Sequence, residues 1–260
     1  MSAVGRCTAI TGAAGGIGRE LCRHFAGAGH ALAMIDRQSS VLAFAEELTS
    51  EGHSAAAAIA DIADAEQVLR AFAELREKLG PVSVLINNAG FSCEPTLAKA
   101  THKGWAEHIA GNLNGAFHCS KAALPDMIAG GGNIVMIASV NGLMALGDPA
   151  YSAAKSGLLS LTRALAVEYG KHSIRANAVL PGTVRTPIWD ERRKSDPKVL
   201  ETLERWYPLG RIVEPSEVVA TVDFLISDAA GAITGALIPV DCGLTAGNIV
   251  MSGELTLEDH

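Results

Sequence analysis

Short apolar runs alternate with longer segments of mixed polarity along almost the whole chain. Most of these runs are continuously apolar, which is typical of strands covered on both faces of a sheet. Segments such as AEQVLRAFAELREK (65–78) place apolar residues at steps of three and four and therefore predict helices. The predicted strands are residues 7–10, 31–35, 54–60, 82–87, 133–139, 174–180 and 236–240. This alternation predicts an α/β fold with a doubly wound parallel sheet and right-handed crossovers.

Two segments depart from this pattern. Residues 188–210 are highly charged yet carry Trp189, Trp206 and Tyr207. A long excursion after a late strand is where a substrate lid is expected, so we predict a lid here, with an ordinary surface helix as the alternative. Residues 249–260 are predicted to be a short polar tail. Because the 260 residues carry no linker or internal repeat, we expect a single Rossmann-type domain.

Composition and charge exclude several classes of protein. Hydrophobic residues make up 48% of the chain, but no apolar run is long enough to cross a bilayer and the start lacks a signal-peptide core, so a soluble cytoplasmic protein is expected. The net charge of -7 argues against a nucleic-acid partner. Five scattered cysteines without a CxxC pair indicate reduced thiols. No metal site is expected, because the adjacent His118 and Cys119 would point about 100° apart on a helix.

The sequence TGAAGGIG (11–18) follows the first predicted strand and opens the first predicted helix. Glycines at such a turn let the backbone approach a pyrophosphate, and the helix N-terminus presents free N–H groups to it. Two registers fit the spacing, one using Gly12, Gly16 and Gly18 and the other using Gly12, Gly15 and Gly18. The alternative is a glycine-rich turn that holds no ligand.

Asp36 ends the second predicted strand, AMID, just beyond this loop in the chain. An acidic side chain at that place accepts hydrogen bonds from ribose hydroxyls and repels a 2′-phosphate, which favours NAD over NADP. The next residue, Arg37, is able to pair with a phosphate and keeps NADP use open.

The sequence YSAAK (151–155) carries the candidate reaction chemistry. Tyr151 and Lys155 lie four positions apart, on one face of a helix that Asp148 and Pro149 are predicted to begin. Lowering the pKa of Tyr151 far enough for it to act as a base near neutral pH requires the phenolate to be stabilised by about 4 kcal/mol. A Lys charge about 5 Å away supplies about 3 kcal/mol, and the helix end and an oxidised nicotinamide are expected to supply the rest. Ser139, predicted at the end of the fifth strand, either hydrogen-bonds a substrate oxygen or only its own backbone.

With these features in one topology, the chain resembles the short-chain dehydrogenase/reductase family over essentially its whole length. Further motifs of that family stand at matching places, namely Asp61-Ile62, NNAG (87–90), NLNG (112–115) and PGTVRTP (181–187). The resemblance implies a dehydrogenase that moves a hydride between NAD and a secondary alcohol or ketone. It also selects Gly12, Gly16 and Gly18 as the working glycines. Gly15 is then the variable position, where NADP-using relatives often place Arg or Lys.

The resemblance assigns roles to individual residues. For catalysis it implies Asn112, Ser139, Tyr151 and Lys155. For cofactor binding it implies Gly12, Gly16, Ile17, Gly18, Asp36, Asp61, Ile62, Asn88, Tyr151, Lys155, Val184 and Thr186. Asp61 and Ile62 would meet the adenine and Asn88 the adjacent ribose, while Lys155 would hold the nicotinamide ribose. Val184 and Thr186 would contact the carboxamide side. Asn112 would position a water that links Lys155 to solvent, or else would only satisfy nearby backbone.

Two other functions remain open from the sequence. One is an NAD-retaining epimerase or dehydratase of the extended branch, which uses the same Tyr and Lys and carries a larger C-terminal domain. The other is a non-enzymatic nucleotide-sensing protein, whose expected sign is a broken catalytic set. Two departures from the family pattern are a loop after Ser139 that is one residue shorter than in many relatives and Cys242 at a position that is usually Gly.

Substrate and assembly are less sharply indicated. A polyol, a sugar or a hydroxy acid is favoured, and a ketoacyl thioester remains open. The residues expected to line the pocket are Cys93, Glu94, Asn141, Met144, Leu146 and the Trp-bearing segment, with Arg192, Arg193 and Lys194 available to a thioester's phosphate. The helix that carries Tyr151 is apolar or small on nearly every side, so we expect a partner subunit and, from the resemblance, a homotetramer or homodimer.

Overall fold

A seven-stranded parallel sheet forms the centre of the computed structural model, which describes residues 5–93, 95–187, 189 and 194–258. The strand order is β3-β2-β1-β4-β5-β6-β7. The strands are β1 (Cys7–Thr11), β2 (Ala31–Asp36), β3 (Ala55–Ile59), β4 (Val82–Asn87), β5 (Gly132–Ile137), β6 (Ile174–Pro181) and β7 (Leu237–Val240). Each predicted strand is therefore confirmed, as is the doubly wound α/β fold. β5 ends earlier than predicted because Ser139 accepts the N–H of Asn141 and starts a short 3₁₀ turn.

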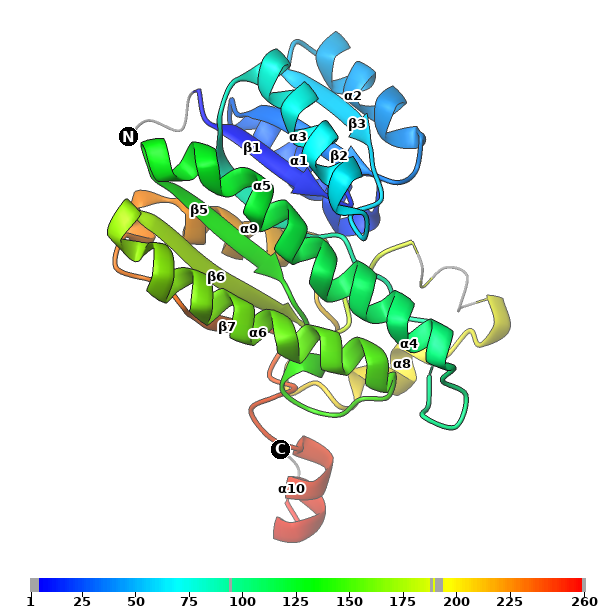
Figure 1. Cartoon of the computed structure of the whole chain (residues 1–260). Helices are drawn as coiled ribbons and strands as arrows, with labels where there is room; N and C mark the ends of the chain where they lie inside the picture. The colour runs from blue at the N-terminus through cyan, green and yellow to red at the C-terminus, as the bar shows by residue number, and fades with distance from the viewer. Residues whose placement is uncertain (1–4, 94, 188, 190–193, 259–260) are drawn as a thin grey trace.

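Helices cover both faces of the sheet (Figure 1). They are α1 (Gly16–Gly27), α2 (Ser40–Ser50), α3 (Ala65–Leu79), α4 (His102–Ile109), α5 (Gly115–Gly130), α6 (Pro149–Tyr169), α8 (Val199–Glu204), α9 (Pro215–Ile226) and α10 (Ile249–Thr256). One face packs against α3, α5 and α6, and the other against α1, α2 and α9. Burial on both faces explains why the strands are continuously apolar.

The helix that carries the candidate chemistry starts as the sequence predicts. Asp148 is the N-cap of α6, and its side chain accepts the N–H of Tyr151 at 3.1 Å. Pro149 occupies the first turn, where its missing N–H costs nothing. The backbone of Asp148 is left-handed, with φ 40°, a conformation that Asp tolerates better than most residues. The entry to α6 is thus built from local sequence.

The sheet order reverses between β1 and β4, which are neighbours although the chain passes through β2 and β3 between them. The chain leaves these two strands toward opposite faces of the sheet, so the loops that follow them diverge. In open parallel sheets, ligands bind in the crevice at such a switch point. The glycine loop follows β1 and the NNAG sequence follows β4, so both candidate motifs meet there.

The described part of the predicted lid forms a small apolar cluster of its own. Leu200, Tyr207 and Ile212 are buried there and pack with Trp189 and Trp206. A short helix, α8, lies within it, while residues 188 and 190–193 fall outside the described residues.

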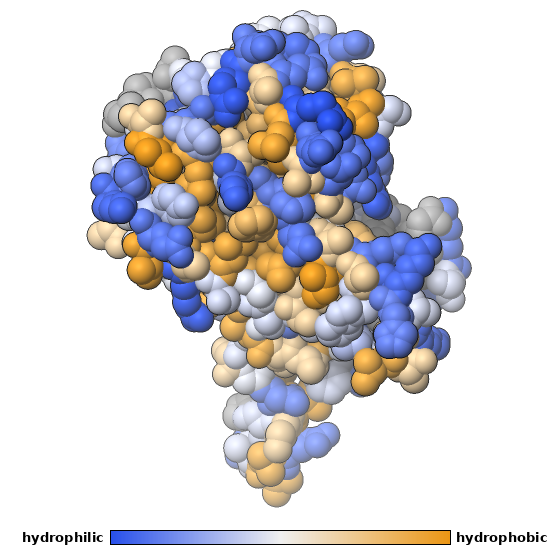
Figure 2. Space-filling model, viewed as in Figure 1, coloured by the Kyte–Doolittle hydropathy of each residue, from blue (hydrophilic) through white to orange (hydrophobic). Residues whose placement is uncertain are grey.

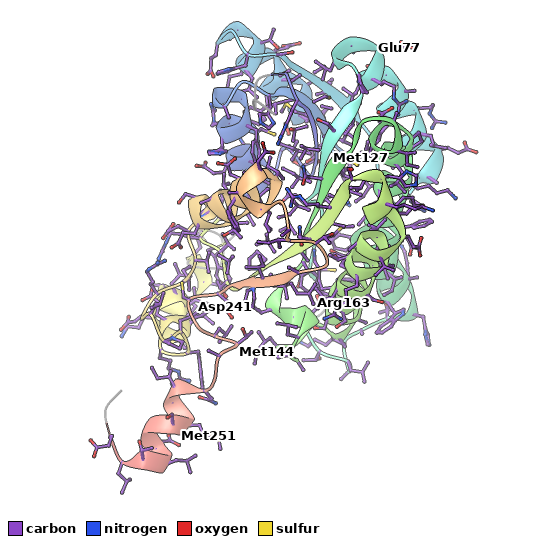
Figure 3. All side chains as sticks on the ribbon, turned by 90° about the vertical axis from the view of Figure 1, so that its left-hand side faces the viewer. Glu77, Met127, Met144, Arg163, Asp241 and Met251 are labelled. Carbon is purple, nitrogen blue, oxygen red and sulfur yellow. The ribbon has the colours of Figure 1, made fainter. Side chains whose placement is uncertain are left out.

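The predicted short polar tail is corrected by the structure. Residues 249–256 form α10, whose first N–H groups are capped by Asn248, and Met251 and Leu255 on it are 55% and 72% exposed. Figures 1 and 3 show α10 standing away from the rest of the molecule, at the end that also carries Met144 and Asp241. Apolar residues recur here at helical spacing and form a helix, although the polar residues between them had suggested a tail.

Cys242 lies in the turn after β7 with φ 51°, the left-handed region that favours glycine. The turn at this usual Gly position thus keeps a glycine-like backbone conformation although the residue is Cys. Burial raises the pKa of its thiol, so it is a poor nucleophile at neutral pH. Within the described ranges, no helix combines the length and apolarity needed to cross a membrane.

Candidate active site

The four glycines of TGAAGGIG differ in how much room each leaves for a Cβ atom. Gly12 has φ 65°, and a Cβ on it would lie 2.8 Å from the backbone of Ala89. A Cβ on Gly18 would lie 2.0 Å from the carbonyl oxygen of Gly12, and one on Gly16 would lie 3.0 Å from Thr186. A Cβ on Gly15, by contrast, would lie 3.4 Å from the Gly12 oxygen, an ordinary van der Waals contact. The geometry thus separates Gly12, Gly16 and Gly18 from Gly15, in line with the predicted register.

A cleft of about 500 Å³ runs along this loop at the carboxyl ends of β1, β2 and β4. Its wall is tied together by Asn88, whose side-chain amide donates to the carbonyls of Thr11 and Gly12 at 3.0 and 3.1 Å. Of the residues predicted to bind a cofactor, those that line this cleft are Gly12, Gly16, Ile17, Gly18, Asp36, Asp61, Ile62, Asn88 and Thr186. One cleft therefore collects residues from five separate segments of the chain.

Asp36 stands at the end of β2 with its carboxylate held in place. One oxygen accepts the N–H of Ala14 at 2.9 Å, and the other accepts the N–H of Gln38 at 2.9 Å. Two fixed donors orient the carboxylate beside the glycine loop, and its remaining lone pairs are available to hydroxyl groups. Arg37 also lines the cleft, and its guanidinium lies 5.6 Å from the centre of the Phe91 ring.

A second cavity of about 890 Å³ adjoins the cleft, and Ile17, Asn88, Gly90 and Thr186 line both. Ser139, Tyr151, Lys155 and Val184 line this cavity. The short turn after β5 and the first turn of α6 thus bring the predicted serine, tyrosine and lysine to one wall.

Lys155 is held rigidly beneath this wall. Only 3% of it is exposed, and its ammonium donates to the carbonyl of Ile137 at 2.8 Å. The nitrogen lies 5.4 Å from the centre of the Tyr151 ring. Burial lowers the pKa of Lys155 to about 8, because a charged amine loses hydration there.

Tyr151 loses hydration in this wall. Burial raises its pKa, the hydrogen bond with Ser139 acts in the opposite direction, and the nearby Asp148 carboxylate adds to the rise. The predicted lowering, to which the charge of Lys155, the helix end and an oxidised nicotinamide contribute together, stays a prediction. Ser139 also hydrogen-bonds Asn141, donating to its side-chain oxygen at 3.3 Å and accepting its N–H at 3.2 Å, and a contact with a substrate oxygen stays a prediction.

Asn112 lies in an irregular π-helical turn (Ala110–Asn114) between α4 and α5. Its side-chain oxygen accepts the N–H of Phe91 at 3.0 Å, and its amide donates to the carbonyls of Phe91 and His108 at 3.0 and 3.1 Å. A Cβ on Gly90 would lie 2.8 Å from the Asn112 oxygen and 3.2 Å from the Lys155 nitrogen. Asn112 thus satisfies backbone groups and also packs beside Lys155 across Gly90.

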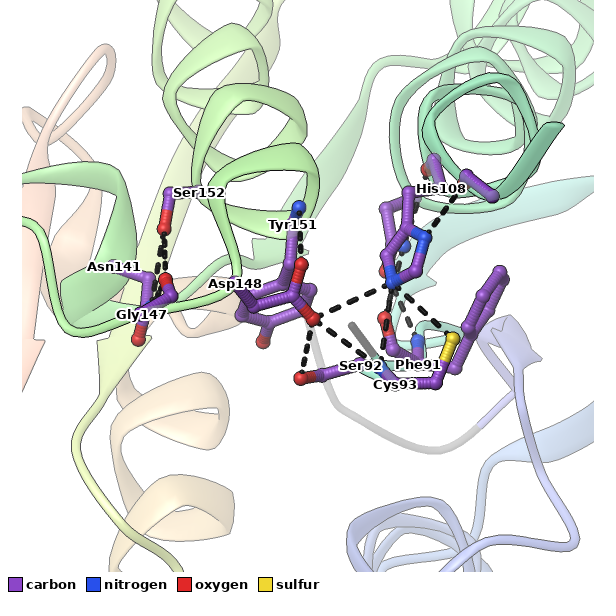
Figure 4. Close-up of polar contacts among 11 residues, drawn as sticks. Phe91, Ser92, Cys93, His108, Asn141, Gly147, Asp148, Tyr151 and Ser152 are labelled. Atoms are coloured by element: carbon purple, nitrogen blue, oxygen red, sulfur yellow. Dashed lines mark hydrogen bonds and ion pairs between the residues drawn. The ribbon is translucent and has the colours of Figure 1, made fainter. Parts of the chain in front are cut away.

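A polar network beside Tyr151 has no counterpart in the sequence predictions (Figure 4). One oxygen of Asp148 accepts from the Ser92 hydroxyl at 2.7 Å and from the Cys93 N–H at 3.2 Å. His108 Nε2 lies 3.4 Å from the same oxygen. The spacing of His108 four residues before Asn112 was the only available sign, since it places both on one face of the helix.

The structure describes some of the residues that were predicted to line the substrate pocket. Asn141, Met144, Leu146, Trp189 and Trp206 line the larger cavity, as expected. Glu94, Arg192 and Arg193 lie outside the described residues. Cys93 contacts His108 instead, with Sγ 3.6 Å from Nε2.

Tyr207 of the Trp-bearing segment also lines the larger cavity, as does Asn248, which the sequence did not assign to it. The Tyr207 hydroxyl accepts the N–H of Thr183 at 2.9 Å. This bond ties the segment after α8 to the loop that follows β6, so Tyr207 helps to position the wall it belongs to.

The burial of Lys155 predicts a cost in stability. At pH 7 the ammonium is charged in both the folded and the unfolded chain, and the fall of its pKa from 10.5 to about 8 corresponds to about 3 kcal/mol of destabilisation. Lys155→Met removes that cost but leaves the Ile137 carbonyl unpaired, which costs about 1–2 kcal/mol. We expect the variant to be inactive and about 1–2 kcal/mol more stable at pH 7 in denaturant unfolding.

The stability gain should shrink as the pH rises from 8 to 10.5, because the folded wild type then loses the proton that the unfolded chain keeps. Lys171→Met, at an exposed lysine, is the control and should show no such pH dependence. A Lys155→Met variant less stable than the wild type at pH 7 would contradict the argument.

Comparison with known proteins gives consistent matches over nearly the whole chain. A family model described as enoyl-(acyl carrier protein) reductase matches residues 12–245. An uncharacterized oxidoreductase of Schizosaccharomyces pombe is 41% identical over 263 residues, covering 100% of this chain and 98% of the relative. The galactitol 2-dehydrogenase (L-tagatose-forming) of Cereibacter sphaeroides is 40% identical, covering 93% of this chain and 95% of the relative.

Solved structures agree with these relatives. An oxidoreductase of the short-chain dehydrogenase/reductase family from Burkholderia thailandensis superposes with a TM-score of 0.91 at 46% identity, covering 98% of this chain and 99% of that one. A gluconate 5-dehydrogenase from Burkholderia cenocepacia J2315, in complex with NADP and tartrate, superposes with a TM-score of 0.88 at 31% identity, covering 94% and 96%.

Proposed function

The chain belongs to the short-chain dehydrogenase/reductase family of oxidoreductases, and from this premise we propose that it is an NAD-preferring dehydrogenase of secondary alcohols, with a polyol or sugar as substrate. The observation that carries the proposal is that two cavities adjoin, with Ile17, Asn88, Gly90 and Thr186 lining both and Tyr151 lining the larger one. The glycine cleft opens into the larger cavity beside Ser139, Tyr151 and Lys155. A cofactor in one and an alcohol in the other would meet at this wall.

The residues of the cleft fit a dinucleotide. Its floor is a cradle that side chains at Gly12, Gly16 or Gly18 would fill, and the N-terminus of α1 opens onto it. Asp36, Asp61, Ile62 and Asn88 would hold the adenosine half, and Lys155, Val184 and Thr186 the nicotinamide half. When bound, the nicotinamide supplies the site that accepts or returns the hydride. The oriented carboxylate of Asp36 favours ribose hydroxyls over a 2′-phosphate.

Tyr151 is the residue that would exchange the proton. Its phenolate oxygen would take the proton of the substrate alcohol during oxidation, and the resulting phenol would return it during reduction of the ketone. The Ser139 hydroxyl, already bonded to Tyr151, is placed to hydrogen-bond the same substrate oxygen. The Lys155 ammonium favours the phenolate because it lies 5.4 Å from the ring and is fixed by Ile137.

The substrate class rests on the lining and on the relatives. Ser92, Asn141 and Asn248 offer polar groups to hydroxyls, and Trp189 and Trp206 offer flat apolar walls of the kind that sugars contact. Galactitol and gluconate are named as substrates of two similar proteins. These features together favour a polyol or sugar over a ketoacyl thioester.

A spectrophotometric panel tests the proposed function. Purified protein is assayed with NAD and a series of polyols, sugars and hydroxy acids, and with NADH and ketoacyl thioesters, following absorbance of the reduced cofactor. We expect turnover of at least one polyol or sugar and a preference for it over the thioesters. Retention of NAD without net turnover would favour the epimerase reading, and absence of NAD binding would favour a different role for the fold.

We propose further that the chain assembles with copies of itself, most simply as a homotetramer. Figure 2 shows apolar side chains gathered over the face that α5 and α6 form in Figure 1. Phe117 and Ile128 on α5 are 46% and 44% exposed, and Val167 on α6 is 83% exposed. A helix pair that leaves such residues uncovered is suited to a symmetric interface.

A further inference from the structure

Ser139 has one hydroxyl hydrogen and two acceptors that compete for it. The Asn141 side-chain oxygen accepts this hydrogen at 3.3 Å, while the backbone N–H of Asn141 donates to the Ser139 oxygen at 3.2 Å. The hydrogen bond between Ser139 and Tyr151 lowers the pKa of the phenol, which requires Ser139 to donate to the phenolate. Because a hydroxyl carries a single hydrogen, Ser139 cannot donate fully to Asn141 and to Tyr151 at the same time.

The side-chain amide of Asn141 is fixed with its oxygen toward Ser139. Its nitrogen donates to the carbonyl oxygen of Gly147 at 3.4 Å and to the Ser152 hydroxyl at 3.2 Å, contacts that Figure 4 shows. The Gly147 oxygen can only accept, and the Ser152 hydroxyl already donates to it at 3.0 Å. A flipped amide would therefore place its oxygen against another acceptor. The Asn141 oxygen is thus a permanent acceptor for the Ser139 hydrogen.

The balance between the two acceptors depends on the charge of Tyr151. While Tyr151 is a neutral phenol, it can donate its own hydrogen to Ser139, and the Ser139 hydrogen remains on the neutral oxygen of Asn141. A phenolate is the stronger acceptor, since hydrogen bonds to ionised groups are roughly twice as strong as those between neutral groups. Ser139 must then break its bond to Asn141 to reach the phenolate, and the lost bond reduces the net stabilisation of the phenolate.

We propose that Asn141 is a positioning residue that holds the Ser139 hydrogen while Tyr151 is protonated and releases it when Tyr151 or the substrate oxygen carries negative charge. Asn141 acts through Ser139 and does not have to touch the substrate. Its oxygen makes the Tyr151 phenolate harder to form than it would be beside Ser139 alone. The proposal rests on the proposed role of Tyr151, but the ionisation of Tyr151 is measurable without any turnover.

The titratable groups near Tyr151 among the described residues come from a few elements. Lys155 lies on the same helix, α6, with its nitrogen 5.4 Å from the Tyr151 ring, and Asp148 caps that helix. Tyr207 lines the same cavity, and His108 on α4 lies 3.4 Å from the Asp148 carboxylate. These groups stay the same when only the acceptor beside Ser139 is changed.

Carbon-13 NMR of protein labelled in the tyrosine rings measures the ionisation of Tyr151. The chain has three tyrosines, so the Tyr151 signal is assigned by its loss in Tyr151→Phe. In Asn141→Leu the ratio of phenolate to phenol at a given alkaline pH should rise about three- to tenfold, which corresponds to one hydrogen bond. Asn141→Ala adds no bulk and should give the same rise. The titration is run both without cofactor and with saturating NAD, and an unchanged or lower ratio in both variants would overturn the proposal.

A second substitution shows whether the effect passes through Ser139. In a Ser139→Ala background, adding Asn141→Leu should leave the phenolate ratio unchanged, because no hydroxyl hydrogen remains to be shared. An equally large rise in that background would mean that Asn141 acts on Tyr151 directly, and the proposal would fail.

Ser156→Ala is the matched control for damage to the turn after β5. The Ser156 hydroxyl donates to the carbonyl oxygen of Gly142 at 3.0 Å, so it ties the same turn to the same helix without contacting Asn141 or Ser139. The Tyr151 ionisation should be unchanged in this variant. A rise as large as that in Asn141→Leu would indicate a general disturbance of the turn and would refute the role of Asn141.

The pH profile of kcat/KM for alcohol oxidation tests the consequence for the reaction. Because the phenolate forms more easily without the Asn141 oxygen, the rise of oxidation with pH should move to lower pH in Asn141→Leu, by the same factor as the ionisation. A loss of activity that is equal at every pH would show a purely structural role for Asn141 and would contradict the proposal.

Discussion

Tyr151→Phe should lower kcat/KM at least about a hundredfold for every substrate that the wild type turns over. The change removes one oxygen from a ring that lines the cavity wall with Ser139 and Lys155. Without the hydroxyl, no neighbouring group among the described residues is placed to exchange the proton at the alcohol oxygen. Ser139 hydrogen-bonds Asn141 and Tyr151, and Lys155 is committed to the Ile137 carbonyl. Proton exchange with water is then the remaining route, and it is slow.

The measurement compares initial rates over a range of pH with saturating cofactor. Wild-type oxidation should rise with pH, because the pKa of Tyr151 is raised and the phenolate is the reactive form. The rise should be lost in Tyr151→Phe, and cofactor binding measured by fluorescence should persist.

Tyr169→Phe is the matched control, because Tyr169 lies at the far end of the same helix and packs against His172. It should retain wild-type activity. Full activity in Tyr151→Phe would remove Tyr151 from its role, whereas equal losses in both variants would indicate damage to α6.

The second large effect concerns the choice between NAD and NADP. We expect the wild type to prefer NAD by at least about a hundredfold in kcat/KM, since the Asp36 carboxylate accepts from ribose hydroxyls and repels a 2′-phosphate. Asp36→Ala should lower that ratio about a hundredfold. Because the carboxylate also holds the N–H groups of Ala14 and Gln38, its loss should weaken the binding of both cofactors. The ratio of kcat/KM with NAD to kcat/KM with NADP therefore isolates the effect of the charge.

Adding Gly15→Arg to Asp36→Ala should reverse the preference. Gly15 accepts a side chain without crowding, with only ordinary contact at 3.4 Å and φ -79°. The same change at Gly18 would force a Cβ to within 2.0 Å of the Gly12 oxygen and serves as the steric contrast. Arg37→Gln tests whether Arg37 contributes to NADP binding. If it does, the residual activity with NADP should fall in this variant. Faster turnover of NADPH than NADH by the wild type would contradict the assignment of Asp36.

Much of the fold and the cofactor side was predictable because the relevant forces act over short stretches of sequence. Continuous apolar runs mark strands that helices cover on both faces. The glycine register followed from the family resemblance, and the structure separates Gly15 from the other three by contact distance. Asp148 and Pro149 specify the start of α6 locally. A parallel sheet then brings the ends of these strands to one edge.

The parts that were missed depend on contacts between distant segments or on burial. Burial raises the pKa of Tyr151, an effect that the spacing of residues along the chain does not reveal. Residues 249–256 form a helix, whereas the polar residues there had suggested a tail.

The sequence by itself determined the order of strands and helices, the position of the glycine loop and the candidate reactive side chains, because periodicity and turn chemistry are local. Only the tertiary structure decided how those side chains are charged. His108 and Asp148 are forty positions apart, and their contact exists because α4 packs against α6. Burial there strengthens every electrostatic interaction, so the working state of Tyr151 is a property of the assembled site.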